Sequence, residues 1–371
     1  MRNINVRTAF VHDWLDTYRG GEKVLEALLE LYPEAPVYTL FYKNDHLPKS
    51  ITSRVVIYPK LLNLFRKFRK FLLPVLPHFV ERLDLSEFDL VVSTSSCVAK
   101  GVKTREDAFH LCYIHSPMRY IWDQQPEYLE SIKHISFAVG FFKLITPYLR
   151  RWDVESSARV DQFVVNSSFV GKRVENLYKR SSVVIHPPIE LERFQIQKQK
   201  NEKDYFIVAG AFVSYKRFDV AIKACVKAGK RLVVAGSGSM EKEWRKHADD
   251  QIEFVIRPSD EQFLQLIQGA KALIFPGVED FGMIAIEAMA CGVPVIAHRQ
   301  GGALDFIKEG QTGRLFDNAN LDELITILDQ FDADEFSSED IRGFAMGFSK
   351  KLFLEKMREQ LQLGLSAGGV Q

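Results

Sequence analysis

Cysteines and long apolar runs are scarce in this sequence. Its 371 residues include four cysteines, far apart and without a CxxC pair. This excludes a disulfide framework and the usual zinc spacing. No apolar run reaches the roughly 18 residues of a membrane-spanning helix, and the N-terminal segment MRNINVRTAFVHDWL is too polar for a signal peptide. We expect a cytosolic protein whose cysteines are reduced and lie in its core: Cys97, Cys112, Cys225 and Cys291.

An excess of charge of either sign is also missing. The formal net charge is +1, with 49 Lys and Arg against 48 Asp and Glu, which argues against a dedicated nucleic-acid binder. No P-loop or GxSxG element occurs, and the glycine motif at 236–238 has Glu241 where the dinucleotide motif needs glycine. The DxD sequence at 332–334 stands in an acidic stretch, and we interpret it as solvated surface rather than a metal motif.

Apolar runs of strand type alternate with helix-type periodicity in both halves of the chain. The clearest runs are at 8–11, 89–93, 109–114, 206–210, 231–235 and 272–275. This alternation predicts α/β domains built on parallel sheets. A polar, charged segment at 190–204 has the composition of a linker. We therefore expect a first domain over 1–190, a second over 191–345, and a final helical segment over 346–371.

The stretch 275–294, FPGVEDFGMIAIEAMACGVP, predicts a strand, loop, helix and strand. Phe281 and Gly282 fall at the helix N-terminus, where free backbone N–H groups and the helix dipole favour an anion. Glu279 lies in the loop and Glu287 more than a turn into the helix, so the two acids should have different roles. The alternative is that Glu279 is a turn residue and Glu287 a solvated helix residue.

Two features of the first half point to the carboxyl ends of its strands, where open parallel sheets bind ligands. Gly20 and Gly21 open a helix after the first strand and would allow a ligand to approach the backbone. His115 follows the run at 109–114 directly. A tight turn and a structural histidine are the alternatives.

The pattern Glu279-x7-Glu287 within FPGVEDFGMIAIEAMACGVPVIA resembles the signature of retaining glycosyltransferases of family 4. The resemblance implies the GT-B fold, in which two Rossmann-like domains face a cleft and the C-terminal helix crosses back to the first domain. It also implies that Glu279 lies by the transferred sugar, that Glu287 binds the ribose, and that the backbone after Glu279 holds the diphosphate. Sugar-donor contacts are accordingly expected at Phe281, Gly282 and Met283.

The same resemblance extends to other segments. YIHSPMRYIWD is similar to a segment of bacterial family 4 enzymes that build surface polysaccharides, which implies that His115 points at the donor sugar. Gly20, Gly21 and Gly236 would adjoin the sugar donor. Family members usually carry an Arg directly after a glycine and a Lys five residues later, both gripping the diphosphate. This chain keeps Lys216 but has Ala211 at the Arg position, and Arg217 is the candidate for the second charge.

Residues 58–80 combine basic and apolar side chains and contain no acid. At helical spacing the leucines and phenylalanines fall on one side, which predicts a basic amphipathic helix suited to an anionic membrane. The expected membrane contacts are Arg66, Lys67, Phe68, Arg69 and Lys70. The alternative is a helix whose apolar face packs on its own domain.

Together these features predict a retaining, metal-independent hexosyltransferase without a cofactor. Similarity to mannosyltransferases implies GDP-mannose as the sugar donor, a lipid-linked saccharide as the acceptor, and surface polysaccharide or O-antigen synthesis at the inner face of the cytoplasmic membrane. A UDP-sugar-dependent enzyme of the same family is the main alternative. A GT-B sugar-nucleotide epimerase, or a fold partner made inactive by Ala211, are the others.

Overall fold

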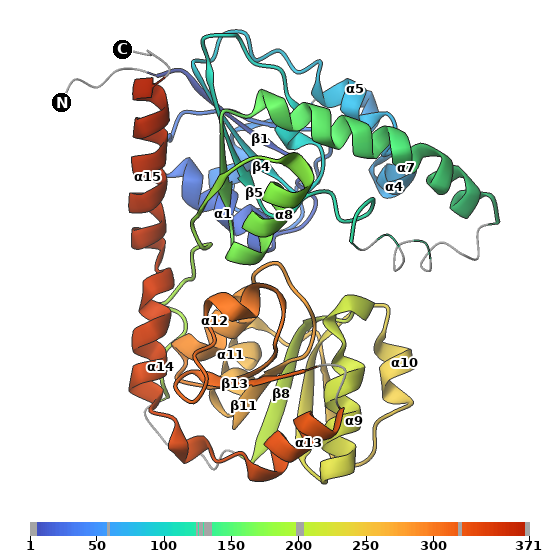
Figure 1. Cartoon of the computed structure of the whole chain (residues 1–371), viewed down its shortest axis with the longest axis vertical. Helices are drawn as coiled ribbons and strands as arrows, with labels where there is room; N and C mark the ends of the chain where they lie inside the picture. Colours follow the sequence, from blue (N-terminus) through green and yellow to red (C-terminus); the bar gives the residue numbers. More distant parts are fainter. Residues whose placement is uncertain are drawn as a thin grey trace. The chain divides into compact units, whose positions relative to one another are not determined.

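The computed structural model describes residues 6–57, 60–123, 125, 129, 136–197, 204–317 and 321–367. The chain divides into two compact units. The first comprises Met1–Pro188 and Lys351–Gln371, and the second comprises Ile189–Lys350. Each unit is built on one parallel sheet covered by helices (Figure 1). The predicted α/β class with two parallel-sheet domains is confirmed.

The first unit contains a seven-stranded sheet in the order β3-β2-β1-β4-β5-β6-β7, with every neighbouring pair parallel. All residues of β1, β4 and β5 are buried, as expected for strands covered on both faces. The two three-residue strands β2 and β3 were not predicted, because they are too short to show a periodicity. The strands are β1 Thr8–His12, β2 Val37–Thr39, β3 Val55–Ile57, β4 Leu90–Ser95, β5 Phe109–Ile114, β6 Gln162–Val165 and β7 Ser182–Val184.

Helices surround this sheet, and one of them comes from the end of the chain. They are α1 Gly20–Leu29, α2 Lys49–Thr52, α3 Lys60–Asn63, α4 Arg69–Leu72, α5 Leu76–Val80, α7 Ser136–Ser156, α8 Ser168–Tyr178 and α15 Lys350–Ala367, with 3-10 turns η1 Arg66–Phe68, η2 Ala99–Gly101 and η3 Ser157–Arg159. No described helix combines the length and apolar composition needed to cross a membrane.

The prediction of one amphipathic helix over 58–80 is wrong for the described part of that segment. The chain instead forms α3, η1, α4 and α5 in succession. Pro74 has no N–H group for a continuous helix, and Pro77 stands at the start of α5. Leu62, Leu73 and Leu76 are buried in the core of the first unit, so the chain turns repeatedly to bring them inward. Tyr58 and Pro59 lie outside the described residues.

The C-terminal helix α15 packs on the sheet of the first unit, which confirms the predicted return of the chain. Phe353, Met357 and Leu361 are buried in that core. The ring of Phe353 meets the ring of Tyr113 on β5 edge to face, with centroids 5.9 Å apart. A Cβ at Gly364 would lie 1.9 Å from the ring of Phe109, so glycine allows that ring to lie against the helix.

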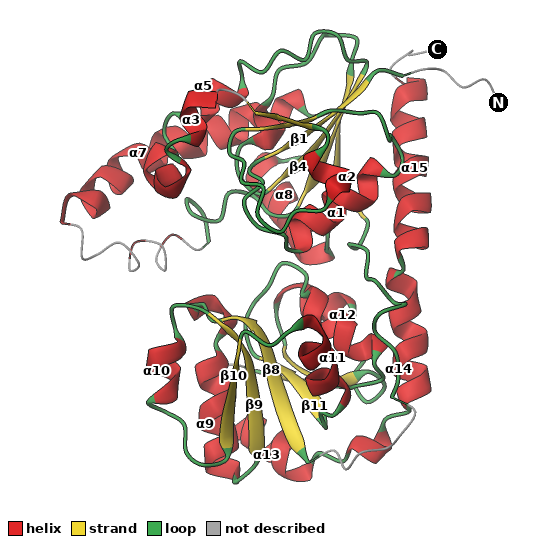
Figure 2. Ribbon diagram, turned by 180° about the vertical axis from the view of Figure 1, so that it is seen from behind, coloured by secondary structure: helices red, strands yellow, loops and turns green. Residues whose placement is uncertain are grey.

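The second unit contains a six-stranded parallel sheet in the order β10-β9-β8-β11-β12-β13 (Figure 2). Its strands are β8 Tyr205–Ala211, β9 Arg231–Ser237, β10 Ile252–Ile256, β11 Ala272–Phe275, β12 Val295–His298 and β13 Gly313–Phe316. Its helices are α9 Phe218–Ala228, α10 Glu241–Arg245, α11 Asp260–Gln268, α12 Met283–Ala290, α13 Leu321–Gln330 and α14 Ser338–Ala345, with 3-10 turns η4 Ser214–Lys216, η5 Gly301–Asp305, η6 Ala333–Glu335 and η7 Met346–Phe348.

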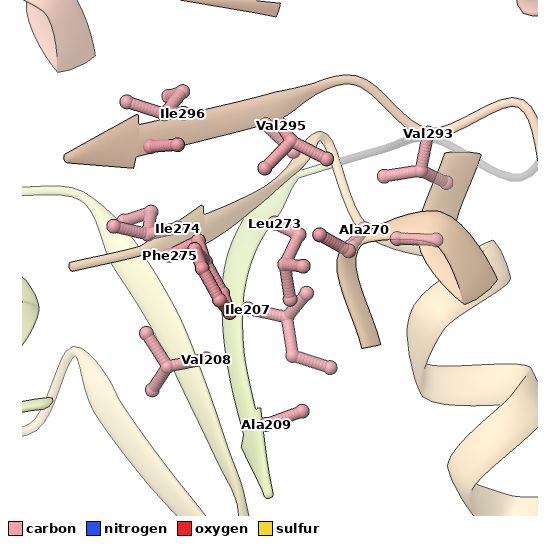
Figure 3. Close-up of a cluster of buried hydrophobic side chains, with 14 of the residues drawn as sticks. Ile207, Val208, Ala209, Ala270, Leu273, Ile274, Phe275, Val293, Val295 and Ile296 are labelled. Carbon is pink, nitrogen blue, oxygen red and sulfur yellow. The ribbon is translucent and has the colours of Figure 1, made fainter. Parts of the chain in front are cut away.

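The core of the second unit lies around β8, β11 and β12. Figure 3 shows Ile207 on β8, Ile274 on β11 and Ile296 on β12 among its apolar side chains. All four cysteines are buried and free, as predicted. Asp332 and Asp334 of the DxD sequence are exposed, and the Asp332 carboxylate accepts the backbone N–H of Asp334 at 2.9 Å. The interpretation of that sequence as solvated surface is confirmed.

Candidate functional site

The order of the second sheet brings the loops after β8 and β11 together. These strands are neighbours although β9 and β10 separate them in the sequence, and ligands of parallel sheets bind at such a point, outside the carboxyl ends. Lys216 follows β8 and Glu279 follows β11. The Lys216 Nζ donates a hydrogen bond to Glu279 Oε1 at 2.6 Å, and the two side chains are 12% and 15% exposed. Two residues predicted from separate motifs therefore form one ion pair.

Glycines allow these two loops to pack backbone against backbone. A Cβ at Gly277 would lie 2.5 Å from the carbonyl oxygen of Tyr215 and 2.8 Å from the Cα of Lys216. A Cβ at Gly210 would lie 3.4 Å from the Lys216 Nζ, so the lysine side chain crosses over this glycine. Replacing Gly277 with any other residue would push the loop of Lys216 away from the loop of Glu279.

A second pair of glycines supports the loop of Glu279. The N–H of Gly302 donates a hydrogen bond to the carbonyl oxygen of Glu279 at 2.9 Å. A Cβ at Gly302 would lie 2.5 Å from the carbonyl oxygen of Asp280, and Gly301 has a φ of +81°. Sequence reasoning missed this support and predicted a helix from Ala303. The available signal was the Gly-Gly pair at a strand-to-helix junction, the same pattern as at 20–21.

The N-terminus of α12 follows directly after the Glu279 loop. Gly282 precedes the helix with a φ of +103°, and a Cβ there would lie 2.5 Å from the ring of Phe275. The ring of Phe281 is buried against Phe306 and Phe348, so its side chain belongs to the core. The first N–H groups of a helix lack partners within the helix, and with the helix dipole they favour an anion at this place.

Met283 and Glu287 lie one turn apart on α12, and both are half-buried. Residues at this spacing share a helix face. The predicted sugar-donor residues Met283 and Glu287 thus lie on one face of the helix whose N-terminus adjoins the ion pair. The structure brings this part of the predicted site together within the second unit.

Arg217 and Gly236 have different surroundings. Arg217 precedes α9 in a left-handed conformation with a φ of +51°, and its Nε donates to Asp219 Oδ1 at 3.2 Å. Its described ion pair is therefore with Asp219 and not with Glu279. A Cβ at Gly236 would lie 1.9 Å from the carbonyl oxygen of Gly210, so close packing of β8 and β9 by itself requires glycine. The predicted roles of both residues stay predictions.

A second group of polar residues lies in the first unit, where β1 and β4 are neighbours. His12 ends β1, and its Nδ1 is 2.6 Å from the Oγ1 of Thr94 on β4. Its Nε2 lies 3.9 Å from the Oε1 of Glu22 on α1. Glu22 also accepts the backbone N–H of Arg19 at 2.8 Å. Burial raises the pKa of Glu22, but His12 and the backbone N–H groups lower it by more, so the net pKa lies below its ordinary value.

His115 lies beside this group and faces the start of α1. Its Nε2 would be 3.5 Å from a Cβ placed on Gly21, so the second glycine of the predicted pair leaves the ring its space; Gly20 is the first residue of α1. The Nε2 is buried and has no hydrogen-bond partner among the described residues. Burial, with a smaller contribution from His12, lowers the pKa of His115 to about 3. The imidazole is therefore neutral at pH 7 and can form a hydrogen bond with a hydroxyl group.

The residues predicted to touch a membrane are divided by the structure. Arg66 is half-buried and Lys67 is exposed. Arg69 forms an ion pair with Asp16 and lies over the ring of Trp14, 5.4 Å from its centroid. The side chains of Phe68 and Lys70 lie outside the described residues. In the described ranges, no group of three or more His, Cys, Asp or Glu side chains is placed to hold a metal ion.

Comparisons with known proteins identify similar families for both halves of the chain. Residues 18–193 match the model of Glycosyltransferase Family 4, and residues 189–345 match the model of Glycosyl transferases group 1. An uncharacterized glycosyltransferase of Methanocaldococcus jannaschii is 26% identical over 201 residues, which is 53% of this chain and 56% of that protein. The alpha-1,3/1,6-mannosyltransferase alg-2 of Neurospora crassa is 26% identical over 233 residues, covering 48% and 50%. The chain thus spans about half the length of these curated relatives.

Solved structures extend the likeness to the whole chain. The crystal structure of HepE from Anabaena in complex with UDP superposes with a TM-score of 0.70 at 15% identity, covering 96% of this chain and 99% of that chain. At this identity the likeness concerns the fold alone.

Proposed function

The chain belongs to the family 4 glycosyltransferases of GT-B fold, and from this premise we propose that it transfers a hexose from a nucleoside diphosphate sugar to a saccharide acceptor with retention of configuration. One observation carries the proposal. Lys216 and Glu279 form an ion pair beside the N-terminus of α12. A cation, a carboxylate and a helix N-terminus at the carboxyl ends of parallel strands suit a sugar joined to a diphosphate.

Lys216 and the N-terminal N–H groups of α12 would stabilise the departing diphosphate, whose negative charge grows as the glycosidic bond breaks. Such prearranged groups act without a metal ion or a cofactor. Removing one donor of this kind typically costs about 3 to 4 kcal/mol of transition-state stabilisation. Arg217 would add a second charge only if it left Asp219, since Ala211 cannot supply the charge that family members carry at that position.

The remaining predicted residues would orient the substrates. Glu279 would hold hydroxyl groups of the transferred sugar, and Glu287 would bind the ribose. His115, neutral at pH 7 because of its lowered pKa, would exchange a hydrogen bond with a sugar hydroxyl. Gly20, Gly21 and Gly236 would give the sugar donor room next to the backbone.

GDP-mannose is the first sugar donor to test. The alg-2 relative is named a mannosyltransferase, and its similarity includes the half of the chain that carries the sugar-donor residues in this family. A UDP-sugar is the alternative, because HepE has been crystallised with UDP and with UDP-glucose. We further propose that the acceptor is a lipid-linked saccharide of bacterial surface polysaccharide or O-antigen synthesis, reached from the cytoplasmic face of the membrane.

Thermal unfolding of the purified protein with GDP, UDP, ADP, dTDP or CDP would test the sugar-donor site. A ligand at 100 times its dissociation constant stabilises the folded state by about 2.7 kcal/mol, which raises Tm by a few degrees. We expect GDP to raise Tm, Glu287→Ala to abolish the shift, and the exposed Glu339→Ala on α14 to retain it. A shift with UDP alone would replace the donor. No shift with any nucleotide would favour the inactive partner.

Turnover distinguishes the other alternative. Incubation with GDP-mannose and a polyprenyl-diphosphate-linked saccharide should release GDP only when the acceptor is present. Conversion of the sugar nucleotide without an acceptor would indicate an epimerase instead.

A further inference from the structure

Large apolar side chains lie on the surface of the first unit in the segment from α3 to α5. Leu64 is 74% exposed, although Leu62 beside it is buried in the core. The other exposed side chains of this segment are Leu61, Phe65, Phe71 and Val75. The short helical turns therefore divide the segment into an inward set of leucines and an outward set of leucines and phenylalanines, so part of its apolar surface is left without a partner in the fold.

The long helix α7 carries a second exposed apolar row. Phe141, Leu144 and Tyr148 are exposed, and Leu144 reaches 78%. Their spacing of three and four residues places them on one face of the helix. Phe142 and Leu149 are buried and anchor the other side of α7 in the core. The exposed row is thus held in a fixed orientation.

The two exposed sets lie near each other. Leu62, Leu73 and Leu76 of the first segment share one core cluster with Phe142 and Leu149 of α7. Figures 1 and 2 both show α7 running beside the short helices α3 to α5. We call the exposed side chains together the outer patch, which consists of Leu61, Leu64, Phe65, Phe71, Val75, Phe141, Leu144 and Tyr148.

The charges around the outer patch have one sign. Neither 60–80 nor 136–152 contains an Asp or Glu. Within the part of the chain that the structure describes, Lys60, Arg66, Lys67 and Lys143 take part in no ion pair. Arg69, one of the predicted membrane contacts, is instead paired with Asp16. Unpaired cations therefore adjoin both parts of the outer patch.

We propose that the outer patch docks on an anionic lipid bilayer, and that α7 is a contact element together with the segment at 61–75. Apolar side chains next to lysines and arginines suit the boundary between headgroups and acyl chains. A second copy of the chain fits less well, because a twofold interface would place the same unpaired cations opposite each other. The role rests on the proposed function only in placing a lipid-linked acceptor there, and lipid binding is measured without the acceptor.

Flotation of the full-length protein with vesicles would test the surface. The vesicles are phosphatidylcholine alone or phosphatidylcholine mixed with phosphatidylglycerol. We expect the wild type to float with the anionic vesicles, and Leu64→Glu and Leu144→Glu each to lower the bound fraction strongly. Leu363→Glu on α15, 57% exposed and outside the outer patch, is the matched control and should bind as the wild type does.

Charge reversal would test the electrostatic part. Each Lys or Arg near an anionic surface contributes about a fivefold factor in binding, so reversing Lys67 or Lys143 to Glu should weaken binding at least fivefold. Lys172→Glu, an exposed change on α8, should leave binding unchanged. Wild-type protein that stays unbound, or Leu144→Glu that binds normally, would overturn the proposal.

Two further measurements distinguish lipid docking from self-association and from nucleotide binding. A dimer in light scattering that Leu144→Glu dissociates would assign the patch to a second copy and overturn lipid docking. The Tm shift with nucleotide, measured on the same variants, reports on the second unit alone. Its absence in a wild type that binds vesicles would refute the proposed sugar-donor site while leaving lipid docking supported.

Discussion

Lys216 and Glu279 meet across two neighbouring strands of the second unit, with 2.6 Å between Nζ and Oε1. The lysine comes from the loop after β8 and the glutamate from the loop after β11. Both side chains are largely buried, so each is the main counter-charge of the other in the absence of a ligand. A bound diphosphate would compete with Glu279 for Lys216, and the carboxylate would then be available to a sugar hydroxyl.

Replacing Lys216 should separate activity from stability. Lys216→Met removes the cation and leaves a mostly buried carboxylate unpaired, so kcat should fall about 100- to 1000-fold and the free energy of unfolding by about 1 to 3 kcal/mol. Adding Glu279→Gln should restore much of the stability but not the activity. Lys223→Met, at a partly exposed position on α9, is the control. A double variant with near wild-type turnover would refute the catalytic role of the pair.

Gly302→Ala should displace the Glu279 loop. The new Cβ would lie 2.5 Å from the carbonyl oxygen of Asp280 and from the Cα of Phe281, and backbone atoms cannot move aside as a flexible side chain could. We expect a weaker nucleotide-induced Tm shift and a reduced kcat. Gly343→Ala on α14 has no atom within 4 Å of its new Cβ and should stabilise the protein by about 0.5 to 1 kcal/mol. Equal behaviour of the two variants would contradict this prediction.

His115 should make the stability of the protein depend on pH. Its pKa in the folded protein is about 3, against about 6.5 in an unfolded chain. Below pH 6.5 the unfolded chain binds a proton that the folded protein does not, so stability falls as the pH is lowered. For this group alone the loss between pH 7 and pH 5 is about 2 kcal/mol.

Urea unfolding at both pH values would measure this effect. His115→Gln should lose about 2 kcal/mol less than the wild type, and the exposed His78→Gln should lose the same amount as the wild type. His110, whose pKa burial lowers to about 4, adds to the pH dependence in all three proteins. An unchanged pH dependence in His115→Gln would show that the ring accepts a proton in the folded state.

The buried ion pair of Lys100 and Asp153 should be important for the stability of the first unit. Lys100 Nζ lies 3.2 Å from Asp153 Oδ1, and both side chains are almost completely buried. Asp153 also accepts hydrogen bonds from Trp122 and Tyr178. Asp153→Asn leaves the lysine without its counter-charge and should cost about 3 to 5 kcal/mol.

The exposed Glu155 on the same helix provides the comparison for Asp153. It pairs with Arg151 one turn away, and Glu155→Gln should change the free energy of unfolding by less than about 1 kcal/mol. Similar losses in the two variants, measured by urea unfolding, would show that burial does not strengthen the Lys100 pair.

Local sequence patterns were sufficient for the longer elements and for the residues of the central motif. The strand β5 and the helix α8 were predicted with nearly their observed bounds, and Lys216 and Glu279 were both named. The prediction failed where the pattern was short or misleading. The three-residue strands β2 and β3 show no periodicity, and the apolar spacing over 58–80 suited one amphipathic helix although prolines and inward-facing leucines divide it.

The sequence by itself determined the α/β class, the linker between the halves and the identity of the charged groups at the strand ends, because these follow from periodicity and residue type along a short stretch. Only the tertiary structure decided which of these groups meet. The contact between Lys216 and Glu279 depends on β8 lying next to β11, and the contact between His12 and Thr94 depends on β1 lying next to β4. Strand order arises from pairing between distant segments, and the roles of Gly277 and Gly302 follow from the backbone that those pairings bring close.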